Sequence, residues 1–137
     1  MIAVPTYAID AGVSYQCHPH HRNGNRNKSQ WSINPPEEVA CFQKTWDEDW
    51  FADDIGWGIH LVSAVANYLG IARDRTTQLI VAKFVCKNKQ SEWHGYPADH
   101  TTSADRPADE ILGRWLADQS LPPAKIRKLQ KGEPCSL

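Results

Sequence analysis

Two short segments hold most of the side chains that could do chemistry. In the first, Cys17-His18-Pro19-His20-His21, a thiol is followed closely by three imidazoles. Thiolate and imidazole ligands at such spacings bind zinc in proteins, so Cys17, His20 and His21 are candidate metal ligands. A second ligand pair does not follow at the spacing of a zinc finger, and half-motifs often match by accident. We therefore prefer a histidine-rich surface loop and predict no cofactor, with zinc as the alternative.

The second segment, from Trp93 to His100, is the densest cluster of aromatic and ionisable side chains in the chain. His94 and His100 could act as general acid or base, because a histidine pKa lies near neutral pH. Asp99 could orient one imidazole, and Tyr96 could donate a hydrogen bond to a developing charge. No nucleophile is identifiable beside them, and packing and turn roles explain the same residues. These four are candidate catalytic residues, and whether the protein is an enzyme stays open.

The C-terminal segment offers a basic surface instead of a reactive one. Residues 107–131 predict a helical hairpin, and its second helix, 122–131, carries four cations and no acid. Two short helices joined by a tight turn resemble a helix-turn-helix in outline, although any helical hairpin does so. Phosphates or an acidic protein surface would suit these cations. The candidate binding residues are Trp93, Tyr96, Lys125, Arg127, Lys128 and Lys131.

The composition bounds what the chain can be. Its 137 residues, 41% hydrophobic and 23% charged, predict a single soluble globular domain over residues 1–137. The net charge of -1 excludes a global basic field, so contact with nucleic acid needs a local patch. No segment is apolar enough to span a bilayer, and the amino terminus lacks the features of a signal peptide, so no membrane partner is expected. Four widely spaced cysteines favour a reducing, cytoplasmic setting.

The strands that must position these side chains follow from apolar spacing. The run 79–86 is nearly continuous in apolar residues, which predicts a strand at the centre of a sheet. A turn and a short strand at 93–96, ended by Pro97, complete a hairpin with it. One or two short strands are expected within residues 2–16. The following segment, 17–34, is polar and is predicted to be a loop.

Four helices are predicted around this sheet. Asn34 is a good cap for the first, which has acids in its first turn. A second is expected at about 59–69, where apolar residues dominate, and the last two form the hairpin at 107–118 and 122–131. The predicted fold class is therefore α+β: a small, mainly antiparallel sheet with about four helices packed on it.

Charge is distributed unevenly along the chain, and this shapes the functional hypothesis. Residues 37–54 hold seven acids and one base, which indicates either a solvated helix face or an acidic patch for a basic partner. The preferred function is a non-enzymatic binding module that contacts protein or nucleic acid through 93–100 and the basic last helix. The alternative is a small hydrolase, for example a metal-dependent nuclease, that uses His94, Asp99 and His100.

Overall fold

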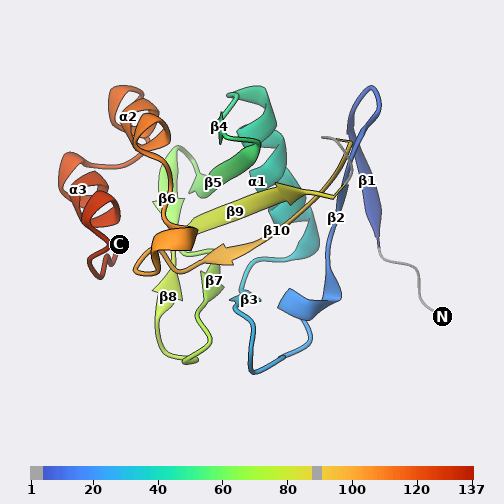
Figure 1. Cartoon of the computed structure of the whole chain (residues 1–137), viewed down its shortest axis with the longest axis horizontal. Coiled ribbons are helices and arrows are strands. Elements are labelled where there is room, and N and C mark those ends of the chain that lie inside the picture. Colours follow the sequence, from blue (N-terminus) through green and yellow to red (C-terminus); the bar gives the residue numbers. More distant parts are fainter. Residues whose placement is uncertain (1–4, 88–90) are drawn as a thin grey trace.

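A mixed β-sheet crosses the molecule and positions the candidate residues (Figure 1). The computed structural model describes residues 5–87 and 91–137, and within them this sheet has seven strands. Neighbouring strands are antiparallel except for one pair, β2 and β10, which is parallel. The strand order is β1-β2-β10-β9-β5-β4, and β6 pairs with β5. The strands are β1 at Thr6–Asp10, β2 at Val13–Gln16, β10 at Glu92–Ala98, β9 at Val81–Cys86, β5 at Ile55–Val62, β4 at Phe51–Ala52 and β6 at Val65–Asn67.

A second sheet and three α-helices complete the described part of the chain. The second sheet is antiparallel and small, with β3 at Gln30–Trp31, β7 at Gly70–Ile71 and β8 at Gln78–Leu79. The helices are α1 at Pro35–Asp47, α2 at Asp109–Ala117 and α3 at Pro123–Lys131, and the 3₁₀ turns are η1 at Pro19–His21 and η2 at Ser103–Asp105.

The predicted fold class is wrong in its proportions. The described residues form a seven-stranded mixed sheet, a second sheet and three α-helices, where a small sheet with about four helices was expected. The main cause is the predicted helix at 59–69, which is instead the hairpin of β5 and β6. Apolar residues at every second position from Ile55 to Leu61 match the period of a strand, and the glycines between them disfavour a helix.

Gly58 shows why β5 carries glycines. A Cβ at this position would lie 2.6 Å from Thr45 Oγ1 of α1 and 2.9 Å from the Phe84 ring. The strand therefore approaches α1 more closely than any side chain would allow, and this contact seats the helix on the sheet. The prediction that α1 begins after Asn34 is confirmed, because Asn34 and Glu37 form a reciprocal capping box.

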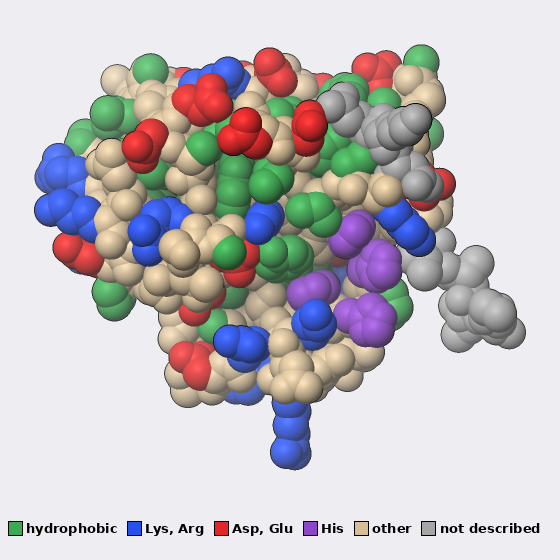
Figure 2. Space-filling view, viewed as in Figure 1, with side chains coloured by type: hydrophobic (Ala, Val, Ile, Leu, Met, Phe, Trp, Pro, Cys, Tyr) green, Lys and Arg blue, Asp and Glu red, His purple; other side chains and the backbone are tan. Residues whose placement is uncertain are grey.

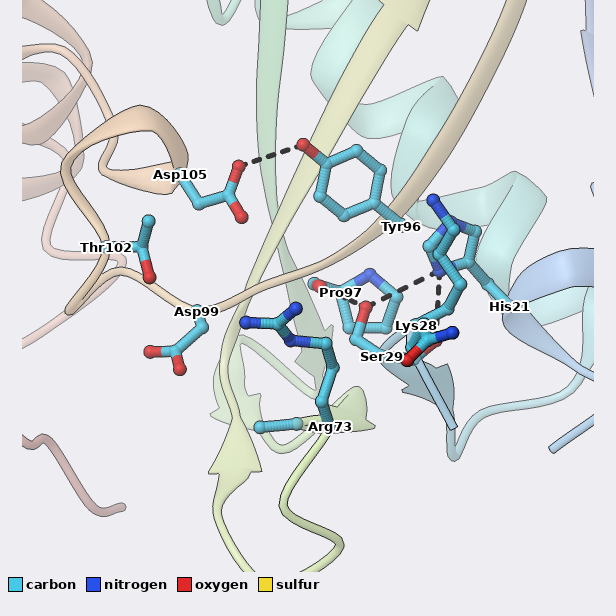
Figure 3. A pocket seen from close by; sticks show the side chains of 11 residues that line it. His21, Lys28, Ser29, Arg73, Tyr96, Pro97, Asp99, Thr102 and Asp105 are labelled. Atoms are coloured by element: carbon cyan, nitrogen blue, oxygen red, sulfur yellow. Dashed lines mark hydrogen bonds between the residues drawn. The ribbon is translucent and has the colours of Figure 1, made fainter. Parts of the chain in front are cut away.

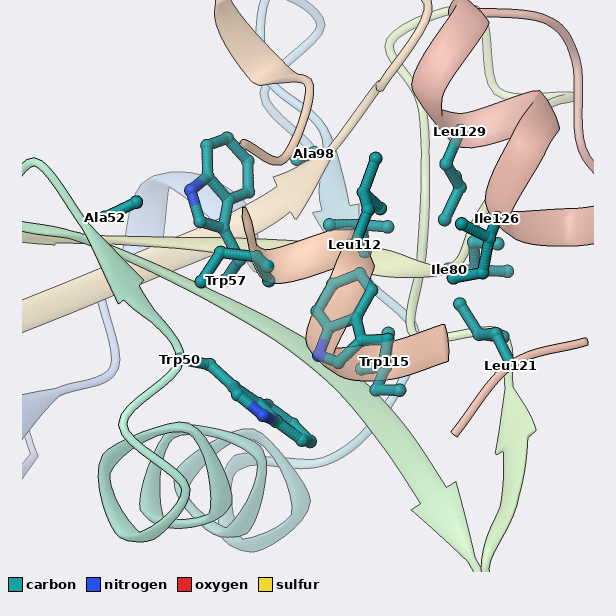
Figure 4. Close-up of a cluster of buried hydrophobic side chains, with 13 residues drawn as sticks. Trp50, Ala52, Trp57, Ile80, Ala98, Leu112, Trp115, Leu121, Ile126 and Leu129 are labelled. Carbon is teal, nitrogen blue, oxygen red and sulfur yellow. The ribbon is translucent and has the colours of Figure 1, made fainter. Parts of the chain in front are cut away.

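The helices cover the two faces of the sheet unequally. One face packs against α1 through Tyr15, Phe84 and Trp93, which bury Phe42. The opposite face is covered by α2 and α3 only toward the end that carries Ala98 (Figure 4). Figure 1 shows both helices at that end of the sheet, with β1 and β2 at the other. Toward β1 and β2, this second face therefore has no covering helix within the described residues.

Other predicted elements agree with the structure, with shifted bounds. The central strand is confirmed as β9, and α3 ends at Gly132, which has the left-handed backbone expected of a helix-terminating glycine. Pro97 does not end β10, which continues to Ala98; β2 pairs with β10 only at Glu92 and Trp93, so Pro97 lies where no β2 partner requires its missing N–H.

Two of the predicted segments lie partly outside the residues that the structure describes. The predicted strand residues before Pro5, and part of the predicted turn before residue 93, lie beyond the described ranges. Within those ranges, no helix has the length and apolar character that crossing a membrane requires.

Candidate functional site

The part of the sheet face that no helix covers carries half-buried polar and aromatic side chains. Along β10, Trp93 and Gly95 face α1, so His94 and Tyr96 face the opposite side. Lys83 of β9 lies beside Tyr96 in the antiparallel register and faces the same side. Figure 2 views this side of the molecule and shows histidine side chains gathered on it, with lysine and arginine side chains nearby.

The parallel pairing of β2 with β10 brings the histidine-rich segment to this surface. Tyr15 lies opposite Trp93, so the chain leaves β2 directly beside His94. The ring centroids of His18 and His94 are then 4.7 Å apart, and those of His18 and His20 are 5.8 Å apart. One turn further on, His21 stacks on Tyr96 at 5.1 Å with an interplanar angle of 15°.

We call this surface the histidine face, and it comprises His18, His20, His21, His94 and Tyr96. Two ring pairs lie side by side along β10: His18 with His94, tilted at 42°, and His21 with Tyr96, which is stacked. Each pair joins a strand residue to a residue of the preceding loop, so the face exists only when both segments are folded.

A buried ion pair fixes the loop that carries three of these histidines. Glu38 of α1 is fully buried, and its Oε1 accepts hydrogen bonds from Arg22 Nε at 3.0 Å and Nη2 at 2.7 Å. Its Oε2 accepts a hydrogen bond of 2.5 Å from the Tyr15 hydroxyl. Burial raises the pKa of Glu38, and the hydrogen bonds from Tyr15 and Arg22 oppose that rise. This latch, Arg22–Glu38–Tyr15, connects β2, the loop and α1.

Backbone contacts hold the rest of the loop. The Arg75 guanidinium donates hydrogen bonds to the carbonyl oxygens of Gly24, Asn25 and Lys28. Gln30 accepts from the Gly24 N–H and donates to the His20 carbonyl oxygen. The loop is therefore preorganised, which lowers the entropy that a ligand would cost on binding.

A hollow of about 360 Å³ adjoins the histidine face. Figure 3 shows Arg73 extending into it between Asp99 and the side that carries Lys28 and Ser29. His21 and Tyr96 form part of its wall. The hollow thus combines two cations and a stacked ring pair with carboxylate and hydroxyl acceptors, which are groups that contact phosphates, bases and sugars.

Tyr96 is held in place by a hydrogen bond from its hydroxyl to Asp105. Its hydroxyl donates to Asp105 Oδ1 at 2.8 Å, and Lys83 Nζ lies 3.4 Å from the same oxygen. Burial, followed by the bond to Asp105, raises the pKa of Tyr96 above its usual value. The ring therefore stays neutral and fixed, and it serves as a surface for stacking.

Burial lowers the pKa values of three imidazoles of the histidine face, His18, His21 and His94, below the ordinary histidine value. For His18 the neighbouring charges of His20 and Lys87 add to burial, and for His94 those of His18, His21 and Lys87 do so. The pKa of His21 is also lowered, mainly by burial, although its bond to the Ser29 carbonyl opposes the shift. His18, His21 and His94 are thus largely uncharged at neutral pH and gain positive charge on acidification.

The predicted catalytic residues do not meet. His94 contacts His18, whereas the Nε2 of His100 lies 2.6 Å from the Glu133 carbonyl oxygen in the C-terminal segment. Asp99 accepts hydrogen bonds from the backbone and hydroxyl of Thr101, as a turn residue does. Asp99 lines one hollow with Tyr96 and another with His100, but His94 lines neither, so the four residues do not converge on one point.

The candidate zinc ligands are also separated. Cys17 is buried on the α1 side of the sheet, where burial and then the charge of Glu38 raise its thiol pKa to about 12. His20 and His21 lie on the opposite side, in the histidine face. Across residues 5–87 and 91–137, no group of three histidine, cysteine or acidic side chains is arranged to hold a metal ion.

The predicted binding residues divide among three places. Tyr96 belongs to the histidine face, but Trp93 is only 2% exposed and packs 5.7 Å from Phe42 on the α1 side. The basic helix α3 packs on α2 through Ile126 and Leu129, at the far end of the sheet from β2 (Figure 1). Its cations, Lys125, Arg127, Lys128 and Lys131, are therefore remote from the histidine face.

Sequence reasoning misses His18, Lys28 and Arg73 as site residues. A signal for His18 exists, because Tyr15 and Cys17 alternate as buried residues and place His18 on the other side. Arg73 has no such signal, since it follows the short strand β7 and reaches the hollow only through the tertiary fold.

Comparison of the chain with protein-family models, curated proteins and solved structures yielded no match. Any functional conclusion therefore rests on the geometry of the site.

Proposed function

We propose that the protein binds single-stranded nucleic acid through the histidine face and the adjoining hollow. The observation that carries this proposal is the combination of two ring pairs, the tilted His18–His94 and the stacked His21–Tyr96, with the Lys28 and Arg73 cations on a sheet face that no helix covers there. Within the described residues, neither the Lys28 ammonium nor the Arg73 guanidinium has a hydrogen bond or ion pair to neutralise it. Aromatic rings that accept stacked bases, bordered by cations for phosphates, are the shared features of single-strand binding surfaces.

Single strands fit this surface better than a duplex does. Bases of a single strand are unstacked and can lie on exposed rings, whereas those of a duplex are covered by their neighbours. Each base stacked on a ring contributes about 1–3 kcal/mol, and cations add an electrostatic term that depends on salt. Asp99 and Thr102 in the hollow offer acceptors for amino groups and sugar hydroxyls.

The alternative hydrolase receives less support. Its three proposed residues, His94, Asp99 and His100, contact different partners and do not surround one point. General acid–base chemistry needs its groups within hydrogen-bond reach of a common substrate. The geometry therefore favours binding without turnover. A reducing, cytoplasmic compartment would suit the buried thiols of Cys17 and Cys41.

Fluorescence anisotropy with a labelled oligonucleotide of about ten residues tests the proposal, since a sheet surface of this kind covers roughly 4–16 nucleotides in other single-strand binders. Wild-type protein should bind saturably, and binding should weaken as salt rises. Replacing Lys28 and Arg73 by Ala should reduce the slope of log K against log salt by about 0.7 per cation.

Histidine variants separate the face from the rest of the molecule. His94→Gln should weaken binding about fivefold or more, because a ring that stacks a base is lost. His60→Gln is the matched control, since His60 also lies on a strand but contacts Glu37 of α1 on the other side of the sheet. Equal binding by wild type and both variants, or a preference for duplex over single strand, would contradict the proposal.

A further inference from the structure

A second pocket, on the α1 side of the sheet, is built almost entirely from aromatic rings and carboxylates. It has a volume of about 450 Å³ and is lined by Trp46, Asp49, Phe51, Asp54 and Trp93. These residues come from α1, the turn after it, β4, the turn before β5, and β10. The pocket lies on the opposite face of β10 from the histidine face and plays no part in the function proposed above.

The rings of the pocket meet at steep angles and do not lie as a flat stack. The Trp46 and Phe51 centroids are 5.8 Å apart with planes at 83°, and those of Phe51 and Trp93 are 5.1 Å apart at 60°. The fully buried Phe42 supports all three from behind. Trp46 and Phe51 are half-buried, whereas Trp93 is only 2% exposed, so the first two rings supply the electron-rich surface that favours a cation over a neutral group.

Hydrogen bonding leaves the ring faces available. The Trp46 indole N–H donates to Asp10 Oδ2 at 3.2 Å, so its single polar atom is satisfied outside the pocket. Phe51 is fixed over Gly56, where a Cβ would lie 2.8 Å from its ring carbon Cε1. The two rings are therefore held as rigid walls, and a ligand would find these walls already formed.

The charge around the pocket is negative. Residues 47–54 hold five acids and no lysine or arginine, and Figure 2 shows acidic side chains along the edge of the molecule above the histidines. Arg114 of α2 is bonded to this segment, but it donates to the backbone carbonyl of Asp49. The Asp49 carboxylate itself has no hydrogen bond or ion pair among the residues that the structure describes.

We propose that this pocket binds a trimethylated lysine side chain within a basic peptide. A methylated ammonium carries its charge under an apolar shell, so it loses less hydration against aromatic rings than a bare ammonium does. Asp49 and Asp54 line the pocket, and two acids outside it, Asp47 and Glu48, extend the negative surface to neighbouring basic residues of the peptide. This extension selects a peptide over a small free cation.

Isothermal titration calorimetry with three peptides tests the proposal. The peptides share one basic sequence and carry trimethyllysine, unmodified lysine, or the neutral isostere in which carbon replaces the trimethylated nitrogen. The trimethyllysine peptide should bind about tenfold or more tightly than either of the others. Equal binding of the neutral isostere would show that the pocket selects apolar volume, and equal binding of unmodified lysine would show charge attraction alone; both results would overturn the proposal.

Variants then assign the binding to the pocket. Phe51→Leu keeps an apolar side chain but removes a ring face, and it should weaken the trimethyllysine peptide about threefold to thirtyfold. Asp49→Asn should also weaken binding, and Asn tolerates the positive φ of 54° at this position. Asp53→Asn is the matched control, because Asp53 has a similar φ of 52° and lies outside the pocket.

Three results would refute the assignment. Binding unchanged in both Phe51→Leu and Asp49→Asn would place the peptide elsewhere on the acidic surface. An equal loss in Asp53→Asn would show that only the overall charge matters. If tetramethylammonium bound as tightly as the peptide does, the occupant of the pocket would be a small cation and the peptide would be excluded. A thermal melt of each variant confirms that it is folded before titration.

Discussion

Removing Arg22 from the latch should destabilise the protein in a manner that depends on pH. Arg22→Met leaves the Glu38 carboxylate fully buried, with the Tyr15 hydroxyl as its remaining strong donor. Breaking a buried ion pair from one side costs about 3–5 kcal/mol, but the Arg22 side chain is 22% exposed, so solvent screening reduces its share. We expect a loss of about 2–4 kcal/mol at pH 7.

Glu38→Gln should cost less, about 1–2 kcal/mol, because the guanidinium left behind reaches water and the amide oxygen still accepts from Tyr15. The double variant should lose less than the sum of the two single losses, since no buried charge is left alone. Urea denaturation followed by tryptophan fluorescence measures all three free energies of unfolding.

The pH dependence of the stability lost in Arg22→Met identifies the buried Glu38 carboxylate as the cause of that loss. Burial already raises the pKa of Glu38, and loss of Arg22 removes a group that lowers it. A carboxyl whose pKa is raised by folding binds its proton more tightly in the folded state, so protonation restores stability as the pH falls toward the ordinary value of 4.5. The gap between Arg22→Met and wild type should therefore narrow from pH 7 to pH 5. A cost below about 1 kcal/mol, or one that is equal at both pH values, would refute this reasoning.

Three further outcomes follow from the structure. Gly58→Ala should cost about 1–3 kcal/mol in urea denaturation, because its methyl would lie 2.6 Å from an atom of α1; a change within about 0.5 kcal/mol would show that the helix can move away. The lowered pKa values of His18 and His94 should reduce the stability of the wild type from pH 7 to pH 5, because the unfolded chain takes up their protons first, whereas the raised pKa of Glu38 acts in the opposite direction. His94→Gln should flatten that fall, and an unchanged pH profile would exclude this imidazole as a contributor. Charge reversal at Lys125 and Lys128 of α3 should change folding stability by less than about 0.5 kcal/mol and leave binding of a short oligonucleotide intact, whereas lost binding would move the interface to α3.

Much of the fold could be predicted where local chemistry decides the structure. Asn34 and Glu37 cap α1 through bonds within four consecutive residues, so the start of this helix is written in the local sequence. The apolar run of β9 likewise predicts a strand at the centre of a sheet. The prediction of a helix at 59–69 is wrong because it follows the apolar content of the segment and not the two-residue period of its apolar positions. The glycines before the segment already disfavour a helix.

The candidate site could be predicted only in pieces. The segments that hold His18 and His94 each contain an unusual density of imidazoles and aromatic rings, and both are identifiable from the sequence. Their contact depends on the parallel pairing of β2 with β10, between residues almost eighty positions apart, and no local signal specifies that register. The same limit explains why His100, close to His94 in sequence, belongs to a different environment.

Nuclear magnetic resonance of the imidazole ring protons tests the central claim most directly. The six histidines of the chain divide into four on the histidine face and two, His60 and His100, that contact Glu37 and the Glu133 backbone instead. During titration with a short single-stranded oligonucleotide at neutral pH, we expect saturable shifts for His18, His20, His21 and His94, with a raised pKa for His18 and His94 in the complex because a phosphate favours the charged form. The signals of His60 and His100 should stay in place. Shifts confined to those two, or no saturable shift in any of the six, would contradict binding at the histidine face.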